Sequence, residues 1–310
     1  VEGEVGNFRV RVRKHPRYII EDECNGCGDC IQICPVEVYN RFDAGIGVRK
    51  AIYKPHTQAV PDIVVRDKEH CIECGLCYDV CGKEAILRED EERVIEIPAA
   101  SIIVTTGYGT FDAGRKTQLR YLTIPDVITS LEFERMINAS GPTGGKVKRL
   151  SNGRPPRSVA FVQCVGSRDL SIDRPYCSGV CCMSAMKNAM LIREKNPDIE
   201  VTIFYNDIRA YGKGYEEYYE RARRLGVRFV RGFPGVGLEP ADGVEEISRM
   251  LGLPRDDSGF FGVADQKTGP VLTVKPGVYV AGTATAPRDI PDSVAMGGAA
   301  AMRAYLDAVR

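Results

Sequence analysis

Net charge, long apolar runs and histidines are all scarce in this sequence. Its 310 residues include 42 lysines and arginines and 42 aspartates and glutamates, so no global charge favours nucleic acid or an anionic membrane as a partner. No uninterrupted apolar run approaches the ~18 residues of a membrane helix, and no signal peptide is recognisable at the start. We therefore expect a cytoplasmic protein that binds neither a membrane nor nucleic acid.

Two motifs common in enzymes are also missing. The three histidines (His15, His56 and His70) form no Ser/His/Asp pattern, and His70 beside Cys71 is more typical of a structural residue than of a metal ligand. No G-x-G-x-x-G loop, which binds dinucleotide phosphates, is present. Because the first residue is Val1 rather than Met, we expect the chain to start inside a longer one.

Cysteine is what the sequence has in abundance, and eight of its twelve cysteines form two C-x2-C-x2-C-x3-C runs. This spacing is typical of proteins with two [4Fe–4S] clusters, in which the fourth cysteine of each run ligates the cluster of the other run. It predicts one cluster at Cys24, Cys27, Cys30 and Cys81, and a second at Cys71, Cys74, Cys77 and Cys34. The alternatives are zinc sites or disulfide bonds. Clusters of this kind indicate a reducing, anaerobic cytoplasm.

Four further cysteines follow a different pattern. Cys164 ends a buried strand predicted at 159–163, the position at which open α/β sheets bind ligands. Cys177, Cys181 and Cys182 lie at or just before the start of a helix predicted at 181–195, whose partial positive charge would stabilise thiolates. The four sulfurs could bind one more iron–sulfur cluster, but this spacing is equally compatible with buried free cysteines or a redox disulfide.

The remaining pattern predicts an α/β protein. We expect strands at 5–13, 63–65, 94–97, 102–104, 159–163, 201–204, 227–230 and 277–282, and helices at 127–139, 181–195, 215–225 and 293–306. Strands that alternate with helices from residue 157 onward favour a parallel sheet. The acidic run 89–92 is interpreted as a solvated turn. The strand at 102–104 ends in Thr105-Thr106-Gly107, a turn that accompanies FAD in flavoproteins but also occurs as a plain strand end.

At these residues the chain resembles the A subunit of heterodisulfide reductase. The matching segments are 161–169, 175–182, 207–217 and 288–294, and the resemblance covers nearly the whole chain. It implies thioredoxin-reductase-like, FAD-binding βαβ domains with an inserted ferredoxin-like α+β domain that carries two [4Fe–4S] clusters. The implied division is 1–16, 91–150 and 236–310 for the FAD domain, 17–90 for the inserted domain, and 151–235 for a second βαβ domain with the extra cluster.

The resemblance also implies cofactors and site residues. It implies FAD and three [4Fe–4S] clusters, the third at Cys164, Cys177, Cys181 and Cys182. Lys187 matches a family lysine close to the flavin ring, although an ordinary surface lysine remains the alternative. The flavin candidates are Thr106, Gly107, Gly282, Asp289, Ile290, Ser293 and Val294. After Phe233-Pro-Gly235 the family continues with further strands before a piece like 237–240, so we expect residues to be missing at this join.

The implied function is electron transfer by an FAD- and [4Fe–4S]-dependent oxidoreductase subunit, with flavin-based electron bifurcation, in methanogenesis. Electrons would pass from a hydrogenase- or formate dehydrogenase-type donor to ferredoxin and to B- and C-type subunits that reduce a disulfide. The assembly would be a hetero-oligomer that could also be dimeric through this subunit. The alternatives are a non-bifurcating conduit in sulfur metabolism and an iron–sulfur scaffold without a working flavin. A pyridine-nucleotide dehydrogenase is less favoured because cysteines occupy its nucleotide region.

Overall fold

A computed structural model describes residues 1–232, 238–288 and 290–309. The chain divides into two compact units, each made of segments that are distant in the sequence. Unit 1 comprises 1–11, 96–127 and 156–310, and unit 2 comprises 12–95 and 128–155. Among the described residues, every helix is too short or too polar to cross a membrane.

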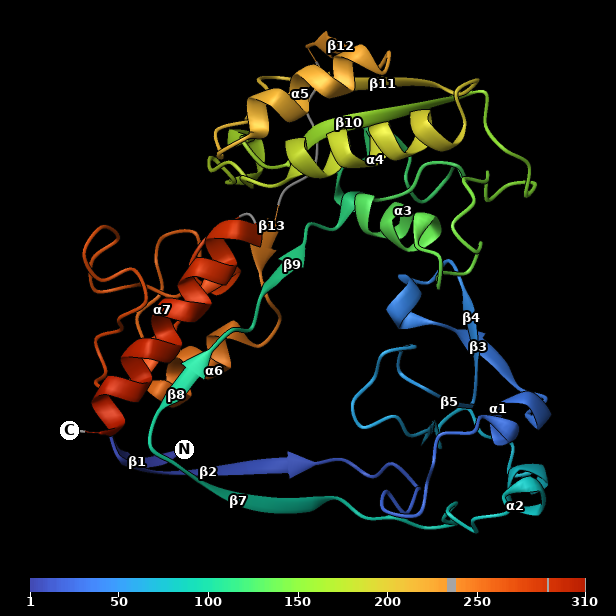
Figure 1. Cartoon of the computed structure of the whole chain (residues 1–310), viewed down its shortest axis with the longest axis vertical. Coiled ribbons are helices and arrows are strands. Elements are labelled where there is room, and N and C mark those ends of the chain that lie inside the picture. The colour runs from blue at the N-terminus through green and yellow to red at the C-terminus, as the bar shows by residue number, and fades with distance from the viewer. Residues whose placement is uncertain (233–237, 289, 310) are drawn as a thin grey trace. The chain divides into compact units, whose positions relative to one another are not determined.

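A three-stranded sheet, in the order β1-β2-β7, carries the chain from unit 1 into unit 2 and back (Figure 1). Its strands are β1 (Glu2–Glu4), β2 (Asn7–Lys14) and β7 (Arg93–Ala99), and β1 runs antiparallel to β2. Phe8 is completely buried, while Asn7 and Arg9 on either side of it are exposed, as the period of two in a strand requires. The residues between β2 and β7 therefore form one excursion from neighbouring strands.

Unit 2 contains two antiparallel strand pairs and two short helices. The strand β3 (Glu37–Tyr39) pairs with β4 (Val48–Lys50), and β5 (Ile52–Tyr53) pairs with β6 (Val65–Arg66). The helices are α1 (Asp29–Ile33) and α2 (Leu76–Val80). A small core of aliphatic residues, which also includes Cys30, holds these elements together. The strand expected at 63–65 is shorter and begins later, as the two-residue β6.

The two ends of this cysteine-containing segment are joined to each other. Ile19 and Ile86 form an antiparallel bridge, and the Leu87 N–H donates to the Tyr18 carbonyl at 2.9 Å. The Asp90 carboxylate accepts hydrogen bonds from the backbone N–H groups of Arg17 and Tyr18 at 2.9 and 3.0 Å. Asp90 is thus not part of a freely solvated turn, because its side chain is only 8% exposed.

Residues 128–155 pack within unit 2 through the helix α3 (Ser130–Ile137), which begins with a capping box between Thr129 and Glu132. The Arg135 guanidinium binds the buried Asp43 carboxylate at 2.8 and 2.9 Å and lies 4.3 Å from the centre of the Phe42 ring. The expected division grouped 128–150 with the FAD domain, so this compact unit follows a different boundary.

One part of unit 1 is the expected parallel sheet, in the order β10-β11-β12 (Figure 1). Its strands are β10 (Ser158–Gly166), β11 (Glu200–Tyr205) and β12 (Arg228–Arg231), and both pairings are parallel. The helix α4 (Cys181–Lys195) packs against β10, β11 and the helix α5 (Tyr215–Arg224). Met186 and Met190 of α4 are buried, so they serve as core.

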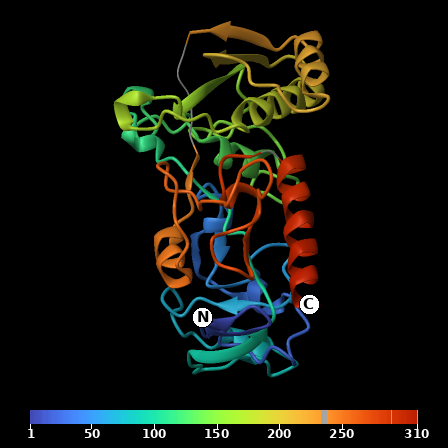
Figure 2. The same cartoon turned by 90° about the vertical axis from the view of Figure 1, so that its left-hand side faces the viewer.

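A second part of unit 1 contains the parallel pair β8 (Ile102–Val104) and β14 (Val278–Val280). The strand β9 (Tyr108–Thr110) pairs antiparallel with β13 (Leu238–Pro240). The helix α6 (Val244–Leu251) shares a hydrophobic core with β8 and β14. The helix α7 (Ile290–Ala308), seen along its length in Figure 2, contacts both β8 and β14. This helix begins three residues before the expected position.

Candidate iron–sulfur centres

The two cysteine runs adopt the same local structure. A glycine with positive φ precedes each short helix, Gly28 with 91° before α1 and Gly75 with 88° before α2. Only glycine adopts this conformation without steric cost, and it turns the loop of the first two cysteines back toward the helix. In both runs the third cysteine is the second helical residue, and the fourth directly follows the helix. The sequence repeat is therefore also a structural repeat.

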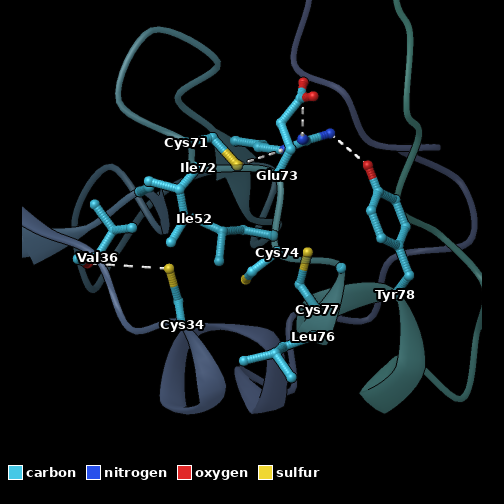
Figure 3. Close-up of a pocket in the computed structure, with 13 residues that line it drawn as sticks. Cys34, Val36, Ile52, Cys71, Ile72, Glu73, Cys74, Leu76, Cys77 and Tyr78 are labelled. Carbon is cyan, nitrogen blue, oxygen red and sulfur yellow. Dashed lines mark hydrogen bonds and ion pairs between the residues drawn. The ribbon is translucent and has the colours of Figure 1, made fainter.

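One pocket brings together cysteines from both runs. Cys34 lies opposite Cys71, Cys74 and Cys77, which line the same pocket (Figure 3). The fourth cysteine of the first run thus faces the first three of the second, as the crossed ligation of two-cluster proteins requires. The assignment of these four residues to one cluster stays a prediction, and the pocket fits it.

The other predicted set also lies close together in the structure. Burial raises the pKa of Cys30 to about 12, and the neighbouring Cys27, Cys24 and Cys81 add to this effect through their negative charge. Cys77 is a further contributor from the second set. Thiolates gathered in a partly buried site repel one another, so these sulfurs would ionise at neutral pH only beside a cationic group. Iron would supply that charge, and this chemistry fits the donor set.

All twelve cysteines lie within the described residues, and none of them is paired in a disulfide bond. Outside the cysteine sets, the side chains of Asp67, Glu69 and His70 lie close together, and His70 contacts Asp67 at 2.9 Å, in keeping with a structural role.

The second constellation gathers at the end of β10. Cys164 and Cys182 are each only 3% exposed. Burial raises the pKa of Cys164, and nearby Cys182 and Cys177 raise it further. The hydrogen bond between Cys181 and Cys182 lowers the pKa of Cys182 to about 7, and the backbone of Arg209 also contributes. Cys164 therefore lies within electrostatic reach of Cys177, Cys181 and Cys182.

The chain path at this point depends on a strained turn. Cys164, two residues beyond the last paired residue of β10, has a φ of +58°, and Gly166 has a φ of +80°. The Ser167 hydroxyl then donates to the Tyr176 carbonyl at 2.9 Å and accepts from the Ser178 N–H at 3.1 Å. These bonds hold the loop of Cys177 beside the end of the strand.

A half-buried arginine, Arg168, lies beside these cysteines. Arg168 donates through Nη2 to Asp207 at 2.7 Å, whereas its Nη1 is buried and finds no hydrogen-bond partner among the residues that the structure describes. Arg168 also lies close enough to Cys164 and Cys177 to interact with both thiols electrostatically. A guanidinium beside these thiols, with its buried Nη1 still able to donate, fits an anionic, sulfur-rich group. Sequence reasoning missed Arg168, whose signal was its position four residues after Cys164.

Several flavin candidates also come together. Gly107 and Gly282 follow the paired strands β8 and β14, with φ of 74° and 62°. A Cβ at Gly282 would lie 3.3 Å from that of Ser293, near the start of α7. Backbone groups at the carboxyl ends of two parallel strands and near a helix start fit the edge of a flavin. Thr106 is exposed in the same turn.

Other candidates are placed less favourably. Ile290 and Val294 on α7 are 79% and 69% exposed. Lys187 is half-buried on α4, and this helix packs against β10 and β11, whereas the flavin candidates Gly107 and Gly282 follow β8 and β14. Asp289 lies outside the described residues, as does the expected join at 233–237.

Comparisons with known proteins identify relatives of this chain. A family described as "4Fe-4S dicluster domain" matches residues 23–86. The A subunit of the H(2):CoB-CoM heterodisulfide,ferredoxin reductase of Methanothermobacter thermautotrophicus is 46% identical over 100% of this chain and 52% of its own length. The second of two iron–sulfur A subunits of the CoB–CoM heterodisulfide reductase of Methanopyrus kandleri is 48% identical over 98% of this chain and 52% of its own length.

A third relative is the A subunit of the H(2)/formate:CoB-CoM heterodisulfide,ferredoxin reductase of Methanococcus maripaludis, 45% identical over 97% of this chain and 51% of its own length. The chain spans about half the length of these relatives. The first alignment runs over 344 positions, more than the 310 residues here, so that relative carries residues without a counterpart in this chain.

Proposed function

The chain belongs to the family of heterodisulfide reductase A subunits, and from this premise we propose that it transfers electrons within an iron–sulfur flavoprotein oxidoreductase. The names of its relatives include H2 or formate, ferredoxin and the CoB–CoM heterodisulfide. For this chain we propose a hydrogenase- or formate dehydrogenase-type donor, ferredoxin, and disulfide-reducing partners of the B and C type. The setting would be a cytoplasmic hetero-oligomer.

The observation that carries this proposal is the convergence of Cys164, Cys177, Cys181 and Cys182 beside Arg168. The dicluster domain alone would support a ferredoxin-like relay. A third sulfur set at the end of a parallel sheet, in the same compact unit as the flavin candidates, supports a route between a flavin and further carriers. We therefore propose three [4Fe–4S] clusters and one FAD for the protein from which this chain comes.

A [4Fe–4S] cluster exchanges one electron and a flavin exchanges two, so together they can divide an electron pair between two acceptors. The chain's own residues prepare this chemistry. The cysteines supply thiolates, and N–H groups such as those of Gly179 and Ala85 approach cysteine sulfurs at 3.4 Å. Burial of Cys164 and Cys182 keeps water from that centre. Lys187 is proposed to place its charge near the flavin.

Iron and flavin quantification on the anaerobically purified complex tests the proposal. About twelve irons per chain and bound FAD are expected, and Cys164→Ala should lose about four irons while the other eight remain. Val165→Ala is the matched control, because Val165 is the next residue along β10, is equally buried and offers no sulfur. Unchanged iron in Cys164→Ala would make these cysteines structural or redox thiols and would remove the third cluster.

The same preparation separates bifurcation from simple conduction. Ferredoxin reduction that requires simultaneous disulfide reduction supports bifurcation, since a simple conduit cannot reduce a low-potential acceptor uphill. Ferredoxin reduction that is indifferent to the disulfide leaves the chain as a non-bifurcating conduit.

A further inference from the structure

The internal repeat of the dicluster domain gives Arg66 an equivalent in the first half. Arg66 stands five residues before Cys71, and Ile19 stands five residues before Cys24. In both halves the first cysteine donates its backbone N–H to the carbonyl four residues earlier, at 3.1 Å for Cys24 and 3.0 Å for Cys71. The two preceding residues therefore occupy matching places in the fold.

The backbone pairing of these two positions confirms the match. Ile19 bridges Ile86 in antiparallel fashion, and Arg66 pairs antiparallel with Ile52. All four residues are buried, with Arg66 only 3% exposed. The repeat thus contains two inward-facing positions with the same backbone but different side chains, one aliphatic and one cationic.

The Arg66 guanidinium is fixed against the second cysteine set. Its Nε donates to Cys71 Sγ at 3.3 Å, and its Nη1 donates to the Tyr78 hydroxyl at 2.5 Å and to the Leu87 carbonyl at 3.1 Å. The dashed lines at Cys71 and Tyr78 in Figure 3 mark these contacts. The acidic partner of Arg66, Glu73, is 3.8 Å away and 59% exposed, so water screens much of its charge.

We propose that Arg66 makes the two clusters of this domain inequivalent, by holding the cluster of Cys34, Cys71, Cys74 and Cys77 at the higher reduction potential. The inference rests on the cluster assignment in the proposed function. Reduction adds negative charge, which a buried cation and an N–H···S hydrogen bond stabilise. The matching position in the first half, Ile19, offers neither. An electron that enters the domain would thus reside on the Arg66 side.

A redox titration of the anaerobic complex, followed by electron paramagnetic resonance, tests this role. Wild-type protein should show two separated midpoints for the domain. In Arg66→Gln the upper midpoint should move to lower potential and approach the other, which should stay in place. Arg66→Lys keeps the charge but loses the Nε donor, so its upper midpoint should fall by a smaller amount.

Arg88→Gln is the matched control. Arg88 lies 4.7 Å from the centre of the same Tyr78 ring that Arg66 approaches at 5.5 Å, but Arg88 is more exposed. Its removal deletes the same charge where water screens it, so the midpoints should move little. Iron content is measured first in every variant. Iron-replete Arg66 variants with unchanged midpoints, or with equal shifts at both clusters, would overturn the inference and leave the proposed function intact. If the wild-type complex lacked the about eight irons expected for the two clusters of this domain, the proposed function would be overturned instead.

Discussion

The arrangement of Cys164, Cys177, Cys181 and Cys182 depends on Gly166, because this position has no room for a side chain. It lies two residues after Cys164, and the Phe111 ring fills the space in which a Cβ would stand, 2.2 Å from the ring's Cγ. Its φ of +80° is strained for any other residue. The turn that aims Cys164 at the other thiols therefore depends on glycine twice, for its backbone and for its lack of volume.

Gly166→Ala should destabilise the protein by more than the ~1–2 kcal/mol that the backbone conformation alone costs. Gly214→Ala is the control, because Gly214 has the same φ of 80°, lies in the same compact unit and has no atom of a described residue within 4 Å of its Cβ position. Urea denaturation of both variants gives the comparison. Equal losses of stability would show that the Phe111 ring yields without cost.

At the scale of single residues, the sequence predicts which cysteines group together but not which charged residues lie beside them. Spacing alone paired Cys34 with the second run, because the motif itself encodes crossed ligation. Arg66 and Arg168 are not identifiable from the sequence, because the folding of the chain, rather than a motif, brings each guanidinium group close to a cysteine sulfur. Asp207, which holds Arg168, follows β11 and lies 39 residues away in the sequence.

Among the elements, the closure between residues 17–20 and 85–90 has the clearest energetic role. The Asp90 carboxylate serves two backbone N–H groups that would otherwise be left without partners. Burial alone would raise the pKa of Asp90, but hydrogen bonds from Tyr18, Arg17 and Glu91 outweigh it and lower the pKa. A group with a lowered folded-state pKa stabilises the fold above its unfolded pKa of about 3.9, and that stability is lost as pH falls through the folded value.

Asp90→Ala should cost about 1–3 kcal/mol at neutral pH, because two donors lose their acceptor. Glu89→Ala is the control at the exposed neighbouring position. The free energy of unfolding, measured between pH 3 and pH 7, should differ most between wild type and Asp90→Ala above about pH 4 and should converge below it. A difference that persists unchanged to pH 3 would contradict the role of the charged carboxylate.

The parallel sheet was predictable from apolar runs that alternate with helices, and α4 begins and ends where expected. The acidic run 89–92 was interpreted wrongly at Asp90, because charge pattern does not reveal which carboxylate turns inward. The expected strand at 63–65 became mostly irregular, since Ile63 and Val64 are buried in unit 2 without extended pairing.

For the molecule as a whole, Arg135 links two stretches that the sequence predicts to lie in different domains. Its partner Asp43 is 92 residues away, and both side chains are nearly buried. A sequence read in order offers no signal for such a pair, which explains why the boundary near residue 150 was expected instead of one near 128. Local periodicity predicted α3 but not the unit to which it belongs.

Arg135→Ala should destabilise unit 2 by about 2–3 kcal/mol, because it leaves the Asp43 carboxylate buried without its cation. Limited proteolysis should then cut within 138–155 faster than in wild type. In the double variant with Asp43→Ala the losses should not add, since both changes remove the same contact. Additive losses would show that the two residues act independently.

The neighbouring strands β2 and β7 have an evolutionary consequence. The chain leaves through one and returns through the other, and the ends of the segment between them are already tied together. A simple hairpin turn would close the same two strands if that segment were absent. Exchange of this segment alone would leave β2 and β7 in place but would remove Asp43, the partner of Arg135, so residues 128–155 would have to change together with it.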